Sequence, residues 1–569
     1  MRTFNKTPLA LGVAAGMAML VASTGAQAAS AGTDLNLSAH TIAGGMAGAA
    51  YTKPQEASAS VFGNPATLTQ FKGVNFNFGA THIFLTDVEV NHTVTTGDTP
   101  GGGIAGALYD QGNITDSTTS SHTSDADNYI VPTLGIALQI SPKLFLGVGL
   151  EADAGLGADY RDDPIDVTGG TNLTQNDGIT PLSPATIPLL VEVISFNANI
   201  AAAYQATDKL SLGAAITIGF GLAQLGTAGQ TSGLSNAFFD VAGDSTGAGA
   251  FGVGGNDEGL NIFSDFGGTT ASVHDLALGW SLGATYEVNE NIMTSLAVKG
   301  PVKYEFENII YMEPTYANGI GGLVGAAGGL GAGWQGLEVE QPLEVIIGAA
   351  YEKGPLLVEA DLIWKNWGDA AAYEDAYENQ FKLALGAQYT TGKWSFRGGY
   401  SWTEEILRDT PNTTLGSLQG VGSIPLGDLA AGTDGVLGIL PGTPLPAGIN
   451  PVANVAEDVI NIVQMSLLPV IWQHNVTAGV GYNFTDAVSV NAFASYAFGE
   501  SESRTTNNLL EVANLVGPAG GLGVNLLDIF GPGGLSNDTI AQDGFASGEI
   551  EQDIGAEVFV GIGINVELP

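Results

Sequence analysis

The segment Ile554–Val566, with the sequence IGAEVFVGIGINV, decides the fold class. Its even-numbered positions hold only Ile, Val or Ala, whereas its odd positions hold Gly, Glu, Phe or Asn. Successive side chains of a β-strand point to opposite faces, so this alternation predicts a strand with one apolar and one largely polar face. Such a strand fits a barrel wall between lipid and a polar lumen.

The same alternation recurs along the chain in segments of about ten residues or more, which is the length of strand that crosses a membrane. We expect about fourteen strands, an even number, as bacterial barrels require. Tight turns such as Ser141–Lys143 and Thr207–Lys209 alternate with long connections. The expected strands are Val74–Leu85, Tyr129–Ile140, Leu144–Leu156, Val191–Gln205, Leu210–Leu225, Asp275–Val288, Ile292–Phe306, Pro342–Tyr351, Leu356–Trp367, Gln380–Tyr389, Trp394–Thr403, Trp472–Phe484, Ala487–Phe498 and Glu551–Val566.

The first 28 residues predict secretion, and the rest predicts a membrane protein. Met1–Ala28 has basic Arg2 and Lys6, a short apolar core and a small-residue end, as in a signal peptide. Mean hydropathy is +0.19 with only 13% charged residues, yet no later apolar run reaches the length of a transmembrane helix. Only helices and closed barrels span lipid. Residues 73–569 are therefore expected to form an all-β, transmembrane antiparallel barrel in the cell outer membrane of a Gram-negative bacterium.

Charge and cysteine content exclude other classes. The chain has 58 acidic and 16 basic residues, for a net charge of −42, so it would repel nucleic-acid phosphates. Cysteine is absent, so the fold has no disulfide and no thiolate chemistry.

The stretch Gln55–Gly73, QEASASVFGNPATLTQFKG, precedes the first expected strand. Asn64-Pro65 predicts a bend, because the residue before a proline is pushed out of the α region and Asn bonds its own backbone. Short turns belong on the periplasmic side, which places both chain ends there. We therefore expect residues 29–72 to form an N-terminal plug, or hatch, inside the barrel.

Several long connections are apolar and others are acidic. The apolar ones either pack against one another or collect an apolar ligand, and both interpretations stay open. Asp125, Asp127, Asp162 and Asp163 either bind calcium or form solvated loops. The apolar connections are Gly321–Trp334, Thr414–Leu468 and Asn508–Ser536.

The chain resembles the FadL/TodX family of outer-membrane transporters of long-chain fatty acids and other hydrophobic compounds. The resemblance rests on Ala59–Thr69 (ASVFGNPATLT), Ala203–Gly213, Gly279–Gly283 and Arg397–Trp402, in that order. It implies a fourteen-stranded barrel closed by a hatch, with long extracellular loops that capture the ligand. The residues of the motif that would gate the hatch are Phe62, Asn64, Pro65 and Ala66.

The resemblance also implies lateral release of the ligand through a gap made by an inward kink of the third strand, here Leu144–Leu156. Gly147, Gly149 and Asp153 lie on its lumen-facing side and are the portal candidates. Glycine weakens a strand ladder, which makes a kink there physically plausible. The expected partners are a long-chain fatty acid or hydrocarbon and outer-membrane lipid, and the protein is expected to be a monomer.

Basic residues on the lumen-facing parity offer a site for a ligand carboxylate. These are Lys299, Lys303, Lys365, Lys382 and Arg397, and the preferred ligand-binding candidates are Lys382 and Arg397. The alternative is a ladder of salt bridges with Glu305, Glu344, Glu359 and Asp361.

Two other functions compete with transport. Gly279-x-Ser281-x-Gly283 matches a nucleophile motif, and Ser281 with His274 would serve an outer-membrane lipid enzyme, but the motif lies within a strand and lacks the strand-turn-helix context. A polar-solute porin or an adhesin is the other alternative, and the plug and apolar loops count against a porin. We expect no catalytic residue, no metal site and no cofactor.

Overall fold

The computed structural model describes residues 35–96, 116–160, 162–166, 186–187, 189–227, 273–312, 333–374, 377–408, 461, 464–466, 472–506 and 545–569. The expected signal peptide and almost all of the three apolar connections lie outside these residues.

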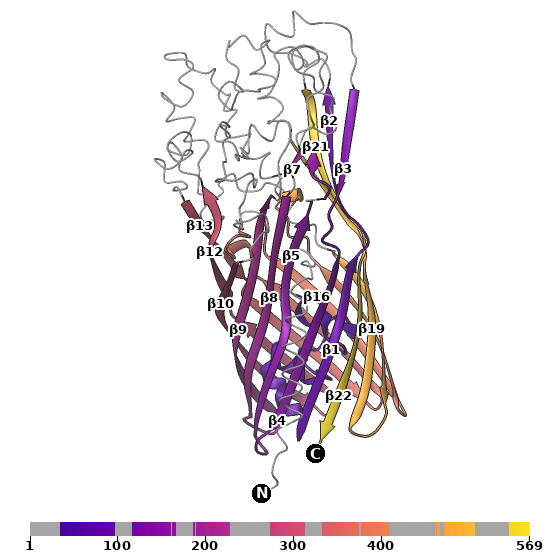
Figure 1. Ribbon diagram of the computed structural model, residues 1–569. Helices are drawn as coiled ribbons and strands as arrows, with labels where there is room; N and C mark the ends of the chain where they lie inside the picture. The colour runs from indigo at the N-terminus through magenta and orange to yellow at the C-terminus, as the bar shows by residue number, and fades with distance from the viewer. Residues whose placement is uncertain are drawn as a thin grey trace, which may run out of the picture.

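Fourteen antiparallel strands form a closed barrel (Figure 1), which confirms the predicted fold class. The barrel closes where β1 pairs with β22, with Val74 opposite Leu568. Short turns and the C-terminus lie at one end, which is the periplasmic end by this criterion. The strands in chain order are β1 (Val74–Leu85), β4 (Asn128–Gln139), β5 (Leu144–Asp159), β8 (Leu189–Gln205), β9 (Leu210–Thr227), β10 (Val273–Asn289), β11 (Ile292–Lys299), β14 (Glu344–Lys353), β15 (Leu356–Lys365), β16 (Gln380–Thr391), β17 (Trp394–Thr403), β18 (His474–Asn483), β19 (Val488–Ala497) and β22 (Glu557–Leu568).

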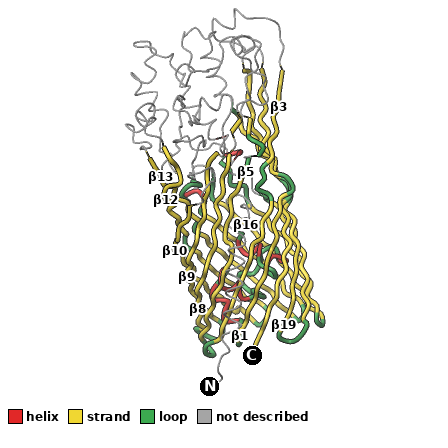
Figure 2. Tube along the Cα trace, viewed as in Figure 1, coloured by secondary structure: helices red, strands yellow, loops and turns green. Residues whose placement is uncertain are grey.

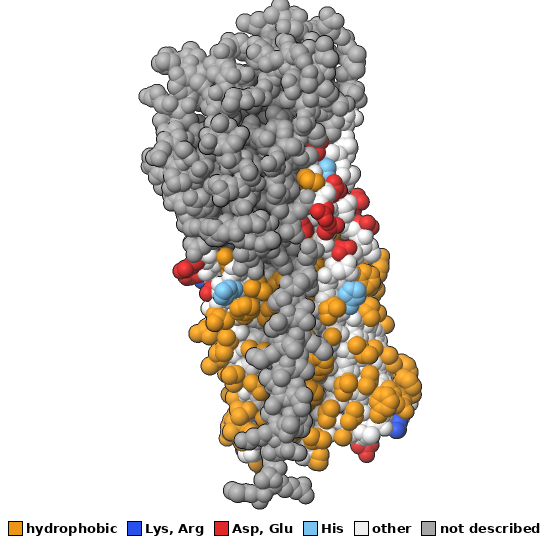
Figure 3. Space-filling model, in the orientation of Figure 1, with side chains coloured by type: hydrophobic (Ala, Val, Ile, Leu, Met, Phe, Trp, Pro, Cys, Tyr) orange, Lys and Arg blue, Asp and Glu red, His pale blue; other side chains and the backbone are white. Residues whose placement is uncertain are grey.

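The outer surface of the barrel is apolar, as the alternation predicts. Large apolar side chains such as Leu276, Leu278 and Ile562 are more than 60% exposed, and Figure 3 shows the resulting hydrophobic band. Exposed aromatic residues gather beside the short turns, which matches the aromatic girdle of a barrel at a membrane interface. They include Tyr204, Tyr286, Tyr351, Tyr389 and Trp394.

The prediction of one continuous seventh strand over Ile292–Phe306 is wrong. β11 ends at Lys299, and β12 (Val302–Met312) pairs instead with β13 (Gly333–Gln341). Pro301 lacks the N–H that a ladder needs, so the break falls at Gly300–Pro301.

The break also reverses the parity of the following side chains. Tyr304 and Phe306 are buried, and a methyl group at Gly219 or Gly221 of β9 would overlap them, so this hairpin lies over the lumen side of β9. Lys303 therefore points away from the expected lumen position and pairs with Glu338.

The last expected strand is also two strands. β21 (Phe545–Ile554) ends before Gly555, and β22 begins at Glu557. β21 belongs to a four-stranded sheet that stands above the barrel in the order β20-β21-β2-β3 (Figure 1). The other strands of this sheet are β2 (Val88–Thr96), β3 (Asp116–Thr123) and β20 (Glu500–Thr505), and a short pair is formed by β6 (Ile165–Asp166) and β7 (Thr186–Ile187).

The helices are short, and most belong to residues 35–72, which we call the N-terminal segment. They are η1 (Asn36–Ala39), η2 (Gly44–Met46), α2 (Ala57–Phe62) and η3 (Pro65–Gln70), followed later by η4 (Trp367–Asp369). Figure 2 shows helical turns within the barrel. Among the described residues, no helix has the length and apolar character needed to cross a membrane.

Candidate functional site: an occupied lumen beside an interrupted wall

The N-terminal segment fills the lumen at the height of the membrane band. Its helices contact strands on several sides of the barrel: α2 contacts β4 and β5, η2 contacts β16 to β19, and η3 contacts β8 to β10. The predicted gating residues Phe62, Asn64, Pro65 and Ala66 are all buried. Their role as a gate stays a prediction.

Asn64 and Pro65 form the bend that the sequence predicts. α2 ends at Phe62, Asn64 is extended (φ −140°, ψ 104°), and Pro65 is the first residue of η3. The Asn64 side chain accepts a hydrogen bond from the Ala66 N–H (3.1 Å) and donates one to the Tyr51 carbonyl (3.0 Å). An Asn cap followed by Pro is a favoured start for a helical turn. One side chain therefore joins two parts of the N-terminal segment.

Glycines on the lumen face make room for this segment. A methyl group at Gly213 would overlap the backbone of Pro65 and Ala66, and one at Gly399 would overlap the backbone of Met46. A methyl group at Gly283 would overlap the Asn64 side chain. Small side chains continue this surface between the glycines, and they include Ala137, Ala201, Ala203, Ala215 and Ala297. The abundance of lumen glycine is thus explained largely by close packing of the N-terminal segment.

Buried carboxylates bind the backbone of the N-terminal segment. Glu359 accepts hydrogen bonds from the N–H groups of Thr52 (2.6 Å) and Lys53 (3.1 Å). Asp361, on the same face of β15, accepts one from Tyr51 N–H (3.3 Å). The salt-bridge alternative would pair these two residues with lumen lysines, whereas the hydrogen bonds described here run to the backbone of the N-terminal segment. Hydrogen bonds to a carboxylate are stronger than neutral ones, so this pair is a main attachment point.

A second attachment point joins the segment to β5 through His40. The Ser58 hydroxyl lies 2.9 Å from His40 Nδ1, and Glu151 of β5 lies 2.7 Å from His40 Nε2. Asn77 Nδ2 also donates to Ser58 (2.8 Å). Burial lowers the pKa of His40 to about 4, although the charge of Glu56 raises it. A neutral imidazole that accepts from Ser58 and donates to Glu151 satisfies every group in this chain.

The barrel wall is interrupted between β4 and β5. The ladder begins where Gln139 of β4 lies opposite Phe145 of β5, and it ends where Thr133 lies opposite Glu151. Beyond that point β4 continues to Asn128 and β5 to Asp159 without pairing to each other. The two strands are linked again farther up, where Asp125 N–H donates to the Asp159 carbonyl (2.8 Å). One link joins Thr133 to Glu151, and the other joins Asp125 to Asp159. We call the unpaired interval between these two links the window.

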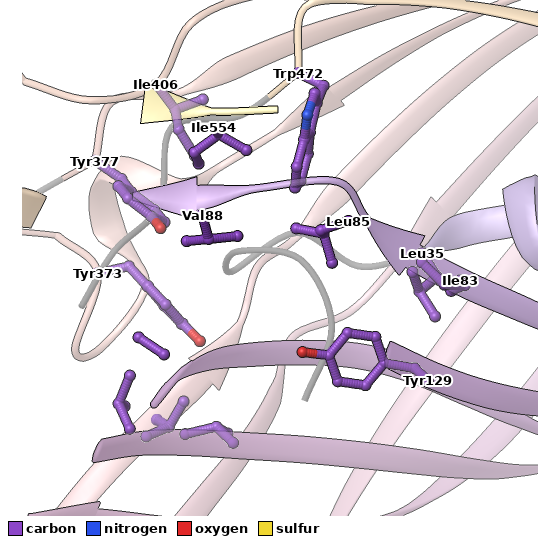
Figure 4. Packing of buried hydrophobic residues seen from close by; sticks show 14 of the residues in the cluster. Leu35, Ile83, Leu85, Val88, Tyr129, Tyr373, Tyr377, Ile406, Trp472 and Ile554 are labelled. Carbon is purple, nitrogen blue, oxygen red and sulfur yellow. The ribbon is translucent and has the colours of Figure 1, made fainter. Parts of the chain in front are cut away.

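A bulge lies at the window. The register between β5 and β8 shifts between Ala152 and Ala154, which leaves Asp153 as the extra residue. A bulge bends its strand, and this accounts for the departure of β5 from β4. The Asp153 carbonyl accepts a hydrogen bond from Leu35 N–H (2.7 Å). Leu35 packs in an apolar cluster with Ile83 and Tyr129, seen in Figure 4.

The three portal candidates therefore occupy different surroundings. Gly147 and Gly149 lie in the continuous part of the β4–β5 ladder, opposite Ala137 and Gly135. Added methyl groups there would overlap Val61, Leu68 and Phe62 of the N-terminal segment. Asp153 is the candidate at the bulge. The signal for the bulge is weak in sequence, because the alternation runs through it.

A cavity borders the window on the lumen side. A cavity of about 40 Å³, partly continuous with solvent, lies between β5, β8 to β11, β14 and the foot of the β12–β13 hairpin. Phe62 belongs to its lining from the N-terminal segment, and Val302 from the hairpin. The polar and charged residues that line it are Glu151, Asp153, Asn197, Asn199, Thr217, Ser281, Lys299, Gln341 and Glu344.

The cation in this cavity is neither of the two preferred candidates. Lys382 donates to Ser38 Oγ of the N-terminal segment (3.2 Å). Arg397 donates to Gln388 (2.6 Å) and to Asn491 (2.9 Å) within the wall. Neither lines the cavity, whereas Lys299 does. Contact of Lys382 or Arg397 with a ligand stays a prediction.

The alternative interpretation, a ladder of salt bridges, holds in one place. Glu344 pairs with Lys299 (3.3 Å) and with Lys365 (3.6 Å), and all three side chains lie toward the lumen. Two lysines thus share this carboxylate.

The residues of the enzyme alternative are not brought together. Ser281 is buried on the lumen face of β10 and lines the cavity. His274 lies on the opposite parity of the same strand, exposed and next to Phe220.

The acidic loop residues meet outside the barrel. Burial raises the pKa of Asp125, and the nearby carboxylates of Asp162, Asp159 and Asp127 raise it further. Within the described ranges, no group of three or more His, Asp or Glu residues is arranged to hold a metal ion.

Together these features define a class: an outer-membrane-type barrel whose lumen is occupied by its own N-terminal segment and whose wall is interrupted beside an inner cavity. The family model for "Outer membrane protein transport protein (OMPP1/FadL/TodX)" matches residues 19–415, which is more than half of the chain. The chain therefore belongs to the FadL/TodX family of outer-membrane transport proteins, and its location is the outer membrane of a Gram-negative bacterium.

Solved structures agree with this fold. The structure of the toluene transporter TodX from P. putida is 15% identical, with a TM-score of 0.51 over 94% of this chain and 99% of that one. A FadL homologue from Pseudomonas aeruginosa is 13% identical, with a TM-score of 0.51 over 95% and 99% of the two chains. At these identities the likeness concerns the fold. No curated protein sequence matches the chain.

Proposed function

We propose that this protein carries hydrophobic compounds, long-chain fatty acids or hydrocarbons, across the outer membrane without an energy source or covalent chemistry. Ligand captured at the extracellular loops enters the lumen cavity and leaves sideways through the window into the bilayer. Movement of the hatch around Asn64-Pro65, with Phe62 and Ala66 as the other gating residues, precedes this lateral release.

The observation that carries the proposal is the window itself. Backbone groups left unpaired in lipid are costly, so an interrupted ladder in a barrel wall needs a compensating role. The cavity reaches this interruption, because Glu151 and Asp153 belong both to the cavity lining and to the window edge. A ligand in the cavity is thus one step from the membrane.

Lateral release also suits the chemistry of an apolar ligand. Transfer from water to hydrocarbon is favourable by roughly 25 cal/mol per Å² of apolar surface, so the ligand gains nothing from an aqueous exit. The buried N-terminal segment obstructs such an exit, which disfavours an open porin.

Deletion of Asp153 tests the proposal. Removing the extra residue brings β5 back into one register with β8 and allows β4 and β5 to pair across the window. We expect cells carrying the wild-type protein to take up radiolabelled oleate or toluene faster than cells without it. The deletion is expected to lower this rate at least about tenfold, equivalent to about 1.4 kcal/mol.

Asp153→Ala is the matched control, because it removes the side chain and keeps the bulge. Its uptake of uncharged toluene should stay within about twofold of the wild type. Equal uptake by the folded deletion variant, judged by heat-modifiable migration in gels, would refute lateral release through the window.

A further inference from the structure

The polar residues of the cavity form a continuous line across the barrel wall. Strand pairing places Glu151 opposite Asn197, Asn199 opposite Thr217, and Ser281 opposite Lys299. Lys299 in turn lies opposite Glu344. This line faces Phe62 of the N-terminal segment and the hairpin residue Val302. The cavity thus combines apolar surfaces with one polar wall.

Several polar atoms on this wall are buried without a partner. Among the described residues, no hydrogen bond reaches Asn197 Oδ1, Asn199 Oδ1, Ser281 Oγ or Gln341 Oε1. These four side chains belong to residues that are each less than 8% exposed, and all four line the same cavity. Three of the atoms are amide oxygens, which accept hydrogen bonds and cannot donate them.

A buried acceptor without a donor costs about 1–3 kcal/mol, so a ligand that brings a donor recovers part of that cost. A pure hydrocarbon leaves these atoms unpaired. The polar wall therefore discriminates between ligands by the group at their end.

The charges around the cavity disfavour a carboxylate at that position. Lys299 is the cation that lines it, and its ammonium group is already paired with Glu344. Glu151 and Asp153 add two more carboxylates on the β5 side. An anionic ligand would meet like charge there without a free guanidinium or ammonium partner among the cavity-lining residues described.

We infer that the cavity selects hydrophobic ligands that end in an uncharged hydroxyl group, an alcohol or a phenol. The hydroxyl donates to the amide oxygens of Asn197, Asn199 or Gln341, and the hydrocarbon part packs against Phe62 and Val302. This inference rests on the proposed transport of hydrophobic compounds, but it replaces the fatty acids and hydrocarbons named there with alcohols and phenols as the preferred ligands of this cavity.

Three probes with one carbon skeleton test the inference: benzyl alcohol, toluene and benzoate. Binding to the purified full-length protein in detergent is measured by titration calorimetry, with the same micelles without protein as the blank. We expect benzyl alcohol to bind about tenfold more tightly than toluene or benzoate, the effect of about one recovered hydrogen bond.

Substitutions that remove one acceptor provide a second readout. Asn197→Leu and Gln341→Met nearly preserve side-chain volume, and each should weaken benzyl alcohol about three- to tenfold while leaving toluene unchanged. Asn483→Leu, at an exposed position near the periplasmic turn, should change neither.

Each outcome of the binding measurements either supports or overturns the preference for a hydroxyl group. Equal affinity for benzyl alcohol and toluene would mean that water alone satisfies the acceptors, and tightest binding of benzoate would mean that Lys299 dominates. Either result, or no binding of any probe, overturns the inference. Uptake by cells is a separate measurement. If the binding tests contradict the preference for a hydroxyl group but deletion of Asp153 still lowers uptake, the proposed transport function stands and the inference about the ligand class is overturned.

Discussion

The backbone N–H of Leu35 donates a hydrogen bond to the carbonyl oxygen of Asp153, with an N···O distance of 2.7 Å. Leu35 is the first described residue of the N-terminal segment, and Asp153 is the bulged residue of β5. His40 binds Glu151 two residues before the bulge. The segment that occupies the lumen is thus attached to the strand that borders the window, and displacement of one affects the other.

Gly399 and Gly398 provide an adjacent pair for testing the fit of the N-terminal segment. Gly399→Ala places a methyl group against the backbone of Met46 and Ala47, which cannot move aside easily. We expect it to weaken docking of the segment by about 1–3 kcal/mol. The measurement is protease cleavage within residues 35–72 of the purified protein.

Gly398→Ala is the control, because the nearest atom to its added methyl group, outside its chain neighbours, is the Thr477 carbonyl oxygen at 3.8 Å. Cleavage should match the wild type. Equal cleavage of both variants would contradict the close packing described for Gly399.

Glu359→Gln is expected to loosen the N-terminal segment at Thr52 and Lys53. The amide keeps one acceptor oxygen and loses the charge that strengthens both hydrogen bonds, at a cost of about 1–3 kcal/mol. Conductance in planar bilayers should show more frequent openings than the wild type.

Glu352→Gln is the matched change at a half-exposed position, where the carboxylate pairs with the Lys53 side chain. Exposed pairs contribute little, so its conductance should resemble that of the wild type. Similar opening frequencies for all three proteins would rule out Glu359 as an attachment point.

Acid is expected to release the N-terminal segment through His40. Burial lowers the pKa of His40 from 6.5 to about 4, so the undocked histidine binds a proton more readily than the docked one. Docking therefore weakens as the pH falls from about 6.5 to about 4, by at most about 3 kcal/mol. Conductance recorded at pH 7, 5.5 and 4.5 measures the effect.

His40→Gln should flatten this pH dependence, because the amide does not titrate. His82→Gln, which changes an exposed histidine of β1, should leave it intact. A steep pH response that persists without His40 would assign the effect to another group.

Asn64→Ala is expected to disturb the bend at Pro65. It removes the acceptor for Ala66 N–H and the donor to the Tyr51 carbonyl, with a cost of about 1–2 kcal/mol. If the bend gates passage, uptake of labelled oleate or toluene changes with it. Asn64→Asp keeps the oxygen that accepts from Ala66 N–H and removes the amide that donates to the Tyr51 carbonyl, so it distinguishes the two contacts. Unchanged uptake in both variants would show that Asn64 is not part of the gate.

The amino-acid sequence by itself determined the barrel. Lipid on one side and a polar lumen on the other impose an alternation of period two, which is local and can be counted, as in Val74–Leu85 and Trp394–Thr403, where both ends agree with the structure. The bend at Asn64-Pro65 is equally local, because the proline ring and the Asn side chain act on neighbouring backbone.

Tertiary structure alone decided which residues meet in the lumen. Pro301 marks the break after β11 in the sequence, but the alternation runs through it, so the direction in which β12 turns is visible only in its packing over Gly219 and Gly221. The alternation of period two shows that a residue faces the lumen. It does not show the height of that residue along the barrel axis or which residues of the neighbouring strands lie beside it. Lys299, Asn197 and Gln341 are brought together by pairings between strands distant in sequence, and Lys382 is carried instead to Ser38, because the barrel register places them there.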